Sequence, residues 1–182
     1  MEELRRLAEL VRKRNQKAGR ISSIFRQPDQ PEKVRERIAS RVFGIEISSG
    51  PGEKVISGHF TEGKLAGNAV NIKWYARNDG RLSMQENPLP DFYLVLTGPK
   101  TGKEGSTAAI SLWTLDYVYL FRTEVIMGQL RLRGAEPSET TRIRRRDWNR
   151  CELYPESRCS YLNLSDAQME MLKLFSSDSV GA

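Results

Sequence analysis

The chain has 182 residues, with 29 Lys and Arg against 23 Asp and Glu, a net charge of +6, and 38% hydrophobic residues. This composition is enough for one domain with a core of its own. No run approaches the roughly 18 apolar residues of a membrane span, and the charged N-terminus is unlike a secretory signal, so we expect a cytoplasmic protein with no membrane partner. The cysteines, Cys151 and Cys159, are too few for a disulfide framework or a four-ligand zinc site, so both are expected to be reduced thiols.

The positive charge is unevenly distributed. Residues 1–43 hold 12 Lys and Arg against 6 Asp and Glu, whereas the remainder holds 17 of each. Within that balanced remainder lies one cluster of cations: Arg142, Arg144, Arg145, Arg146 and Arg150. Such clusters suit contacts to a phosphate backbone. The alternative is a solvated helix and an Arg-rich edge strand that only keep the protein in solution.

The N-terminal quarter has helical periodicity. Apolar residues from Leu4 to Val11 recur at helical spacing, which predicts an amphipathic basic helix over residues 2–15 that ends at Gly19. A second helix is expected over residues 31–43, because Pro31 suits the first helical position and Gly44 suits a stop. The β-rich runs over residues 45–48 and 54–60 then predict a hairpin or meander.

Two strands are predicted in the middle of the chain. Residues 68–77 alternate between an apolar face and a polar face that carries Asn71 and Lys73. Residues 92–97, which follow Asp91, form an uninterrupted apolar run typical of a strand buried on both faces.

The C-terminal part predicts strands and two helices. We expect a bent strand or strand pair over residues 108–121, a helix over 123–133 and an extended segment over 139–146. Ser165 and Gln168 predict a capping box that begins the last helix. Together these elements predict a single α+β domain over residues 1–175 with a mixed central β-sheet flanked by helices. Its parts are an N-terminal basic helix (1–20), a core (30–100) and C-terminal strands and helices (101–175), followed by a flexible tail (176–182).

Asn71 and Lys73 lie two residues apart on one strand face, where one side chain could bind a metal and the other could hold a nucleophilic water. Alternatively, they belong to the solvent face of a half-covered sheet. In its context, with a helix, a hairpin and a later central strand, this pair resembles the (D/E)xK motif of the PD-(D/E)xK nuclease superfamily, which implies a restriction-endonuclease-like fold. The sequence departs from that family where His59 and Phe60 replace the usual Asp and where Asn71 replaces the acid of the motif.

The resemblance implies a Mg²⁺-dependent nuclease that cleaves phosphodiester bonds of DNA or RNA. Glu62 and Asn71 would bind the metal, Glu36 would hold a metal-bound water, and Lys73 would position the attacking hydroxide. The arginine cluster from Arg142 to Arg150 and the first helix would grip the backbone. We expect DNA rather than RNA as the partner and a homodimer as the candidate assembly. Two alternatives remain: an inactive nucleic-acid-binding or complex-assembly subunit of the same fold, and a protein-interaction domain.

Overall fold

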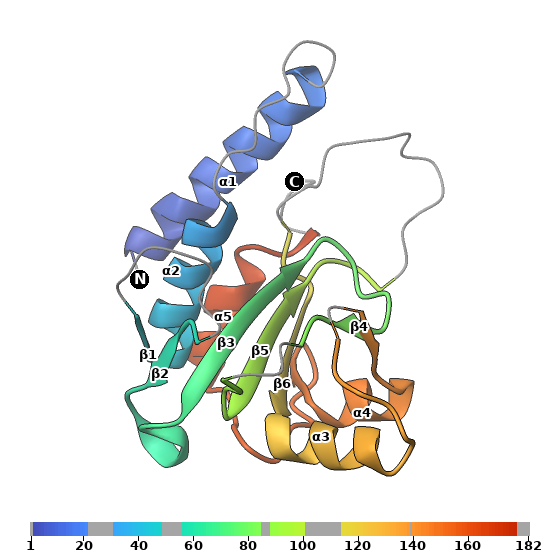
Figure 1. Ribbon diagram of the computed structural model, residues 1–182. Helices are drawn as coiled ribbons and strands as arrows, with labels where there is room; N and C mark the ends of the chain where they lie inside the picture. The colour runs from blue at the N-terminus through green and yellow to red at the C-terminus, as the bar shows by residue number, and fades with distance from the viewer. Residues whose placement is uncertain are drawn as a thin grey trace.

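The computed structural model describes residues 2–21, 31–48, 56–84, 88–100, 114–138 and 140–177. Its centre is a six-stranded mixed sheet in the order β1-β2-β3-β5-β6-β8 (Figure 1). The strands are β1 (Ile45–Ile47), β2 (Gly58–Phe60), β3 (Ala69–Tyr75), β5 (Phe92–Thr97), β6 (Tyr117–Arg122) and β8 (Glu152–Tyr154). Neighbouring strands are antiparallel except β3 and β5, which are parallel. One continuous sheet therefore joins the middle and the C-terminal part of the chain in a single α+β domain.

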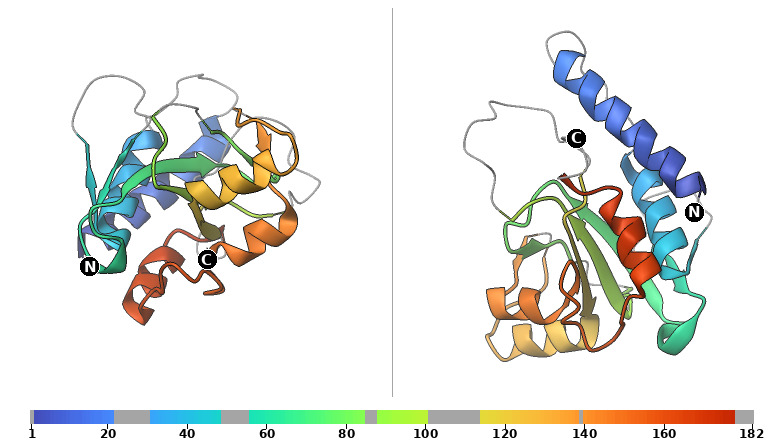
Figure 2. Two further views of the ribbon diagram at one scale, coloured as in Figure 1. Left: turned by 60° about the horizontal axis from the view of Figure 1, so that its bottom comes forward. Right: turned by 180° about the vertical axis from the view of Figure 1, so that it is seen from behind.

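Three helices cover the first face of the sheet. They are α1 (Glu2–Ile21), α2 (Pro31–Phe43) and α5 (Asp166–Lys173), seen in front of the sheet in the rear view of Figure 2. Leu4, Ala8 and Val11 of α1 are buried there with Ile38 and Val42 of α2. The apolar side of β3, Val70 and Ile72, completes this first core cluster.

The second face is covered by shorter elements: β4 (Arg81–Leu82), α3 (Thr123–Arg131), β7 (Thr141–Arg142) and α4 (Arg145–Arg150). β4 and β7 pair as a separate two-stranded ladder. The second core cluster holds alternate residues of β5 and β6 together with Leu82, Ile126, Ile143 and Trp148. A 3₁₀ helix, η1 (Gly63–Leu65), lies between β2 and β3.

Several sequence predictions are confirmed. α2 covers residues 31–43, and the chain leaves it at Gly44 with a φ of +61°, which only glycine adopts without strain. All residues of β5 are buried. Ser165 and Gln168 form the predicted capping box at the start of α5.

Other elements differ from expectation. α1 continues through Gly19 to Ile21, since one helical glycine costs only about 1 kcal/mol relative to alanine. Among the described residues of the predicted extended segment 139–146, only Thr141 and Arg142 form a strand, and the chain is helical from Arg145.

The predictions for residues 49–55 and 101–113 lie outside the described residues. Ser176 is buried and Ser177 donates two hydrogen bonds to the Asp116 carboxylate, so the described chain is still anchored at the start of the predicted tail. None of the helices in the described ranges combines the length and apolar character needed to cross a membrane.

Candidate nucleic-acid interface

The residues predicted to form a metal site are placed on different sides of the sheet. Asn71 and Lys73 alternate along β3 with Val70 and Ile72, which belong to the first core cluster. Their side chains therefore extend from the second face. Asn71 is only 3% exposed there, beside Tyr93 of β5 in the sheet register.

Glu36 and Glu62 do not join this pair. Glu36 is on α2, which packs against the first face. Glu62 is exposed, and its carboxyl group lies beside the turn at Gly44 between α2 and β1. Within the described ranges, no three His, Cys, Asp or Glu residues are grouped so that they could hold a metal ion. The structure therefore does not bring the four predicted residues together on one face of the sheet.

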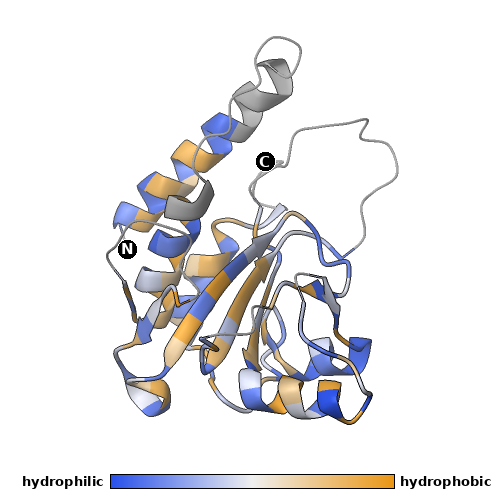
Figure 3. Cartoon of the chain, in the orientation of Figure 1, coloured by the Kyte–Doolittle hydropathy of each residue, from blue (hydrophilic) through white to orange (hydrophobic). Residues whose placement is uncertain are grey.

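The arginines of the predicted cluster are all exposed. They extend from β7 and α4, and Arg81 of β4 lies directly opposite Arg142 in the two-stranded ladder. We call this set the arginine surface: Arg81, Arg142, Arg144, Arg145, Arg146 and Arg150. Figure 3 shows hydrophilic positions over these elements.

Inward-facing residues between the arginines hold the arginine surface in place. Ile143 is buried, and its N–H donates to the Gly80 carbonyl at 3.0 Å. Trp148 of α4 packs edge to face against Tyr119 and Phe121, with ring centroids 4.7 and 4.8 Å apart. Because these residues point into the second core cluster, the arginines between them point to solvent.

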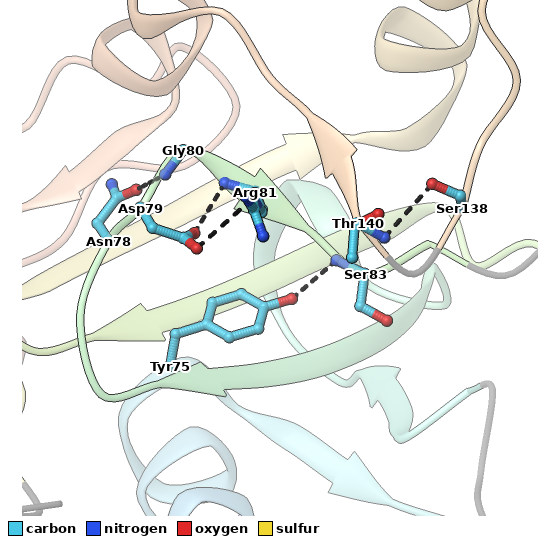
Figure 4. Close-up of polar contacts among 8 residues, drawn as sticks. All are labelled: Tyr75, Asn78, Asp79, Gly80, Arg81, Ser83, Ser138 and Thr140. Atoms are coloured by element: carbon cyan, nitrogen blue, oxygen red, sulfur yellow. Dashed lines mark hydrogen bonds and ion pairs between the residues drawn. The ribbon is translucent and has the colours of Figure 1, made fainter.

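Hydrogen bonds brace the β4–β7 ladder on both sides (Figure 4). The Ser83 N–H donates to the Tyr75 hydroxyl of β3 at 2.9 Å, which ties the end of β4 to the sheet. The Thr140 N–H donates to the Ser138 hydroxyl at 3.3 Å before β7. The ladder that carries Arg81 and Arg142 is thus anchored by side chains from its surroundings.

Most of the arginine surface has no acidic partner. Arg146 lies 3.6 Å from the buried carboxylate of Asp147, and Arg81 lies 3.8 Å from Asp79. Across the described ranges no ion pair involves the other four members: Arg142, Arg144, Arg145 and Arg150. Like charges directly opposite on paired strands, as at Arg81 and Arg142, are destabilising. A phosphate between them would remove that repulsion.

A second polar cluster, which sequence analysis missed, lies at the ends of β5 and β6. Glu152 is 2% exposed and accepts a hydrogen bond from the Lys100 ammonium at 2.9 Å. The same ammonium lies 4.0 Å from the Tyr117 ring centroid. Burial raises the pKa of the neighbouring Tyr119 hydroxyl. Lys100 and Glu152 are 52 residues apart, and nothing in their local sequence indicates that they meet.

A cavity of about 630 Å³ opens beside the start of β5 and the N-terminal end of α3. Its lining combines apolar, aromatic and cationic side chains, including Phe92, Tyr161, Lys64, Arg122 and Arg131. No motif in the sequence points to it, because these residues come from four separate segments of the chain.

Comparison with known proteins gives no relative. No family model, curated protein or solved structure matches this chain.

Proposed function

We propose that this protein binds nucleic acid, with DNA as the expected partner, through its arginine surface and without cleaving it. The observation that carries the proposal is that four exposed arginines lack any ion pair within the described ranges while a packed helix and a braced ladder hold their backbone in place. Guanidinium groups match phosphate oxygens in a two-point geometry, and phosphate contacts supply most of the affinity of nucleic-acid-binding proteins.

The sheet would then be a nuclease-like scaffold that serves binding. The order of elements supports this restriction-endonuclease-like interpretation: helix α2, the β1–β2 hairpin, the strand with Asn71 and Lys73, and central strand β5. Because Glu36 belongs to the other face and Glu62 lies near Gly44, we derive no hydrolytic step from these residues. Fold alone does not imply chemistry.

Fluorescence anisotropy with a labelled DNA duplex, titrated at increasing salt, tests the proposal. We expect the dissociation constant to rise steeply with salt. The double variant Arg144→Ala/Arg145→Ala should weaken binding and flatten the slope of log K against log salt by about 0.9 for each phosphate that it no longer neutralises. Arg146 is left intact because it lies against the buried Asp147 carboxylate.

The matched control is Arg5→Ala/Arg6→Ala, which removes the same charge from exposed positions of α1 on the first face of the sheet. It should leave most of the affinity and the slope in place. Absence of binding at low salt would overturn the proposal. Equal losses in the two double variants would show that net charge, and not the arginine surface, carries the affinity.

A further inference from the structure

The cavity beside α3 is large enough for a nucleotide. Its volume of about 630 Å³ lies within the range of roughly 300–1,000 Å³ that is typical of ligand sites. Its walls come from η1, the segment before β5, one side of α3 along its length and the segment at Tyr161. It therefore lies at the end of the sheet where β3 and β5 begin and β6 ends (Figure 1).

An aromatic side chain is held in this cavity. Tyr161 is half-buried, and its ring packs edge to face on the buried Phe92 at a centroid distance of 5.8 Å. Both residues line the cavity. A tyrosine whose ring is fixed on one side and open on another is a platform on which a nucleobase stacks.

The charged groups at the cavity favour an anion. Lys64 and Arg131 make no ion pair within the described ranges. Arg122 pairs with the largely exposed Glu124 at 3.0 Å, and a phosphate could replace that carboxylate. The remaining acid, Asp91, already accepts a hydrogen bond from the Ala69 N–H at 2.7 Å.

Helix α3 connects the cavity with the arginine surface. Arg131 lines the cavity, whereas Gln129, on another side of the same helix, lies 3.4 Å from Asp147 of α4. The exposed Arg133 follows, its side chain hydrogen-bonded to the Gln129 carbonyl. Figure 2 shows α3 and α4 side by side. Cationic side chains are therefore found from α4, past the end of α3, to the cavity.

We propose that the cavity receives a base of single-stranded DNA, stacked on Tyr161, while Lys64, Arg122 and Arg131 contact the flanking phosphates. This inference rests on the proposed function and names its substrate class. In a duplex each base is stacked and paired, so it reaches such a cavity only after flipping, which costs a few kcal/mol. A single strand offers its bases without that cost.

The test compares a labelled oligothymidine with a labelled hairpin duplex at low salt. The wild type should bind the single strand more tightly. Tyr161→Ala should weaken single-strand binding about tenfold, within the range measured for loss of base stacking, and leave duplex binding unchanged. Tyr161→Phe keeps the ring and should retain the wild-type affinity.

Two further variants do not depend on the packing of Tyr161. Arg131→Ala should flatten the salt slope for the single strand by about 0.7 and leave the duplex slope in place. Glu124→Gln removes a negative charge beside Arg122 and should tighten single-strand binding, a gain that damaged folding cannot produce.

The outcomes separate the two proposals. If the protein binds single strand and duplex equally tightly, and neither Tyr161→Ala nor Arg131→Ala changes the affinity, the cavity inference is overturned. The arginine surface would then remain as the binding site. Absence of binding to either probe would overturn both. Displacement of oligothymidine from the wild type by inorganic phosphate, together with an unchanged affinity of Tyr161→Ala for oligothymidine, would show simple anion binding and also overturn the base-stacking inference.

Discussion

Lys100 supplies the cation that compensates the buried negative charge of Glu152. Glu152 is 2% exposed, and its carboxylate is 2.9 Å from the Lys100 ammonium, which is 40% exposed. Lys100→Met would leave that carboxylate buried without its cation. We expect a loss of about 1–3 kcal/mol in unfolding free energy, less than for a fully buried pair because solvent screens the lysine.

The matched double variant Lys100→Met/Glu152→Gln should recover most of that loss, because no unpaired charge remains. Urea denaturation of the wild type, both single variants and the double variant measures the coupling. If the losses of unfolding free energy in the two single variants add up to the loss in the double variant, Lys100 and Glu152 do not stabilise each other.

Cys151 gives a prediction for alkaline pH. Burial, chiefly, raises the pKa of its thiol from 9.0 to about 12, with smaller contributions from Cys159 and Asp147. The folded state therefore keeps the proton between pH 9 and 12 while the unfolded state loses it. Stability should accordingly be insensitive to this group below about pH 9 and decline above it.

Denaturation at a series of pH values checks this expectation, with Cys151→Ala declining less steeply than the wild type above pH 9. Below about pH 9 the folded protein should also react slowly with iodoacetamide at this position, since the thiolate is the nucleophile. Rapid alkylation of Cys151 in the folded wild type at pH 7 would contradict the raised pKa.

The spacing of Asn71 and Lys73 shows what a local pattern can predict. Alternation along β3 correctly places the two side chains on one face, because a strand has a period of two residues. It carries no information about which face α2 covers. The face that α2 covers depends on long-range packing. The local pattern therefore could not show that Glu36 and Lys73 belong to opposite faces of the sheet.

At the scale of secondary structure, helix α4 depends on a single aromatic residue. It has six residues, too few to be stable alone. Trp148→Ala would remove the ring that contacts Tyr119 and Phe121. We expect a loss of about 3–5 kcal/mol in unfolding free energy, together with weaker DNA binding, because α4 carries Arg145, Arg146 and Arg150.

Trp148→Phe is the matched control. It keeps an aromatic ring and removes an indole N–H that has no hydrogen-bond partner in the described part of the chain. A clearly smaller loss of stability than that of Trp148→Ala is expected, because less buried volume is removed. Thermal denaturation followed by circular dichroism compares the two variants, and equal losses would show that the ring contacts are not what holds α4.

The secondary-structure predictions succeeded where one local signal was strong. The apolar run of β5 and the capping box of α5 each determine an element from adjacent residues. β8 was not predicted, since Glu152, Leu153 and Tyr154 form no alternating pattern and are all buried. A buried glutamate in a short strand becomes intelligible only through its distant partner, Lys100.

At the scale of the whole molecule, the part of the sequence with the excess of cations is not the part of the structure that presents most of the unpaired arginines. The excess of cations lies in residues 1–43, but Glu3 pairs there with Arg37 and Arg41, and Glu9 pairs with Lys13. The arginine surface lies in the balanced part of the chain, yet most of its members have no acid within the described ranges. Sequence counts cannot show this, because pairing depends on tertiary neighbours.

This distribution predicts how salt affects stability. The chain carries a net charge of +6. In the folded state its cationic side chains, the unpaired arginines among them, therefore repel one another. The Debye length falls from about 30 Å at 0.01 M salt to about 8 Å at 0.15 M, so added NaCl screens that repulsion. The melting temperature should therefore rise over this interval at neutral pH.

The double variant Arg144→Ala/Arg145→Ala should melt at a higher temperature than the wild type at 0.01 M salt and gain less from added NaCl, because two of the repelling charges are gone. Arg5→Ala/Arg6→Ala should change the melting temperature less, since Glu2, Glu3 and Glu9 lie on the same helix and Arg6 is attracted to Glu9. Differential scanning calorimetry of the three proteins at both salt concentrations makes the comparison. If the melting temperature of the wild type falls as salt is added, attractive ion pairs dominate its electrostatic energy. Repulsion within the arginine surface would then not be what favours an anionic partner.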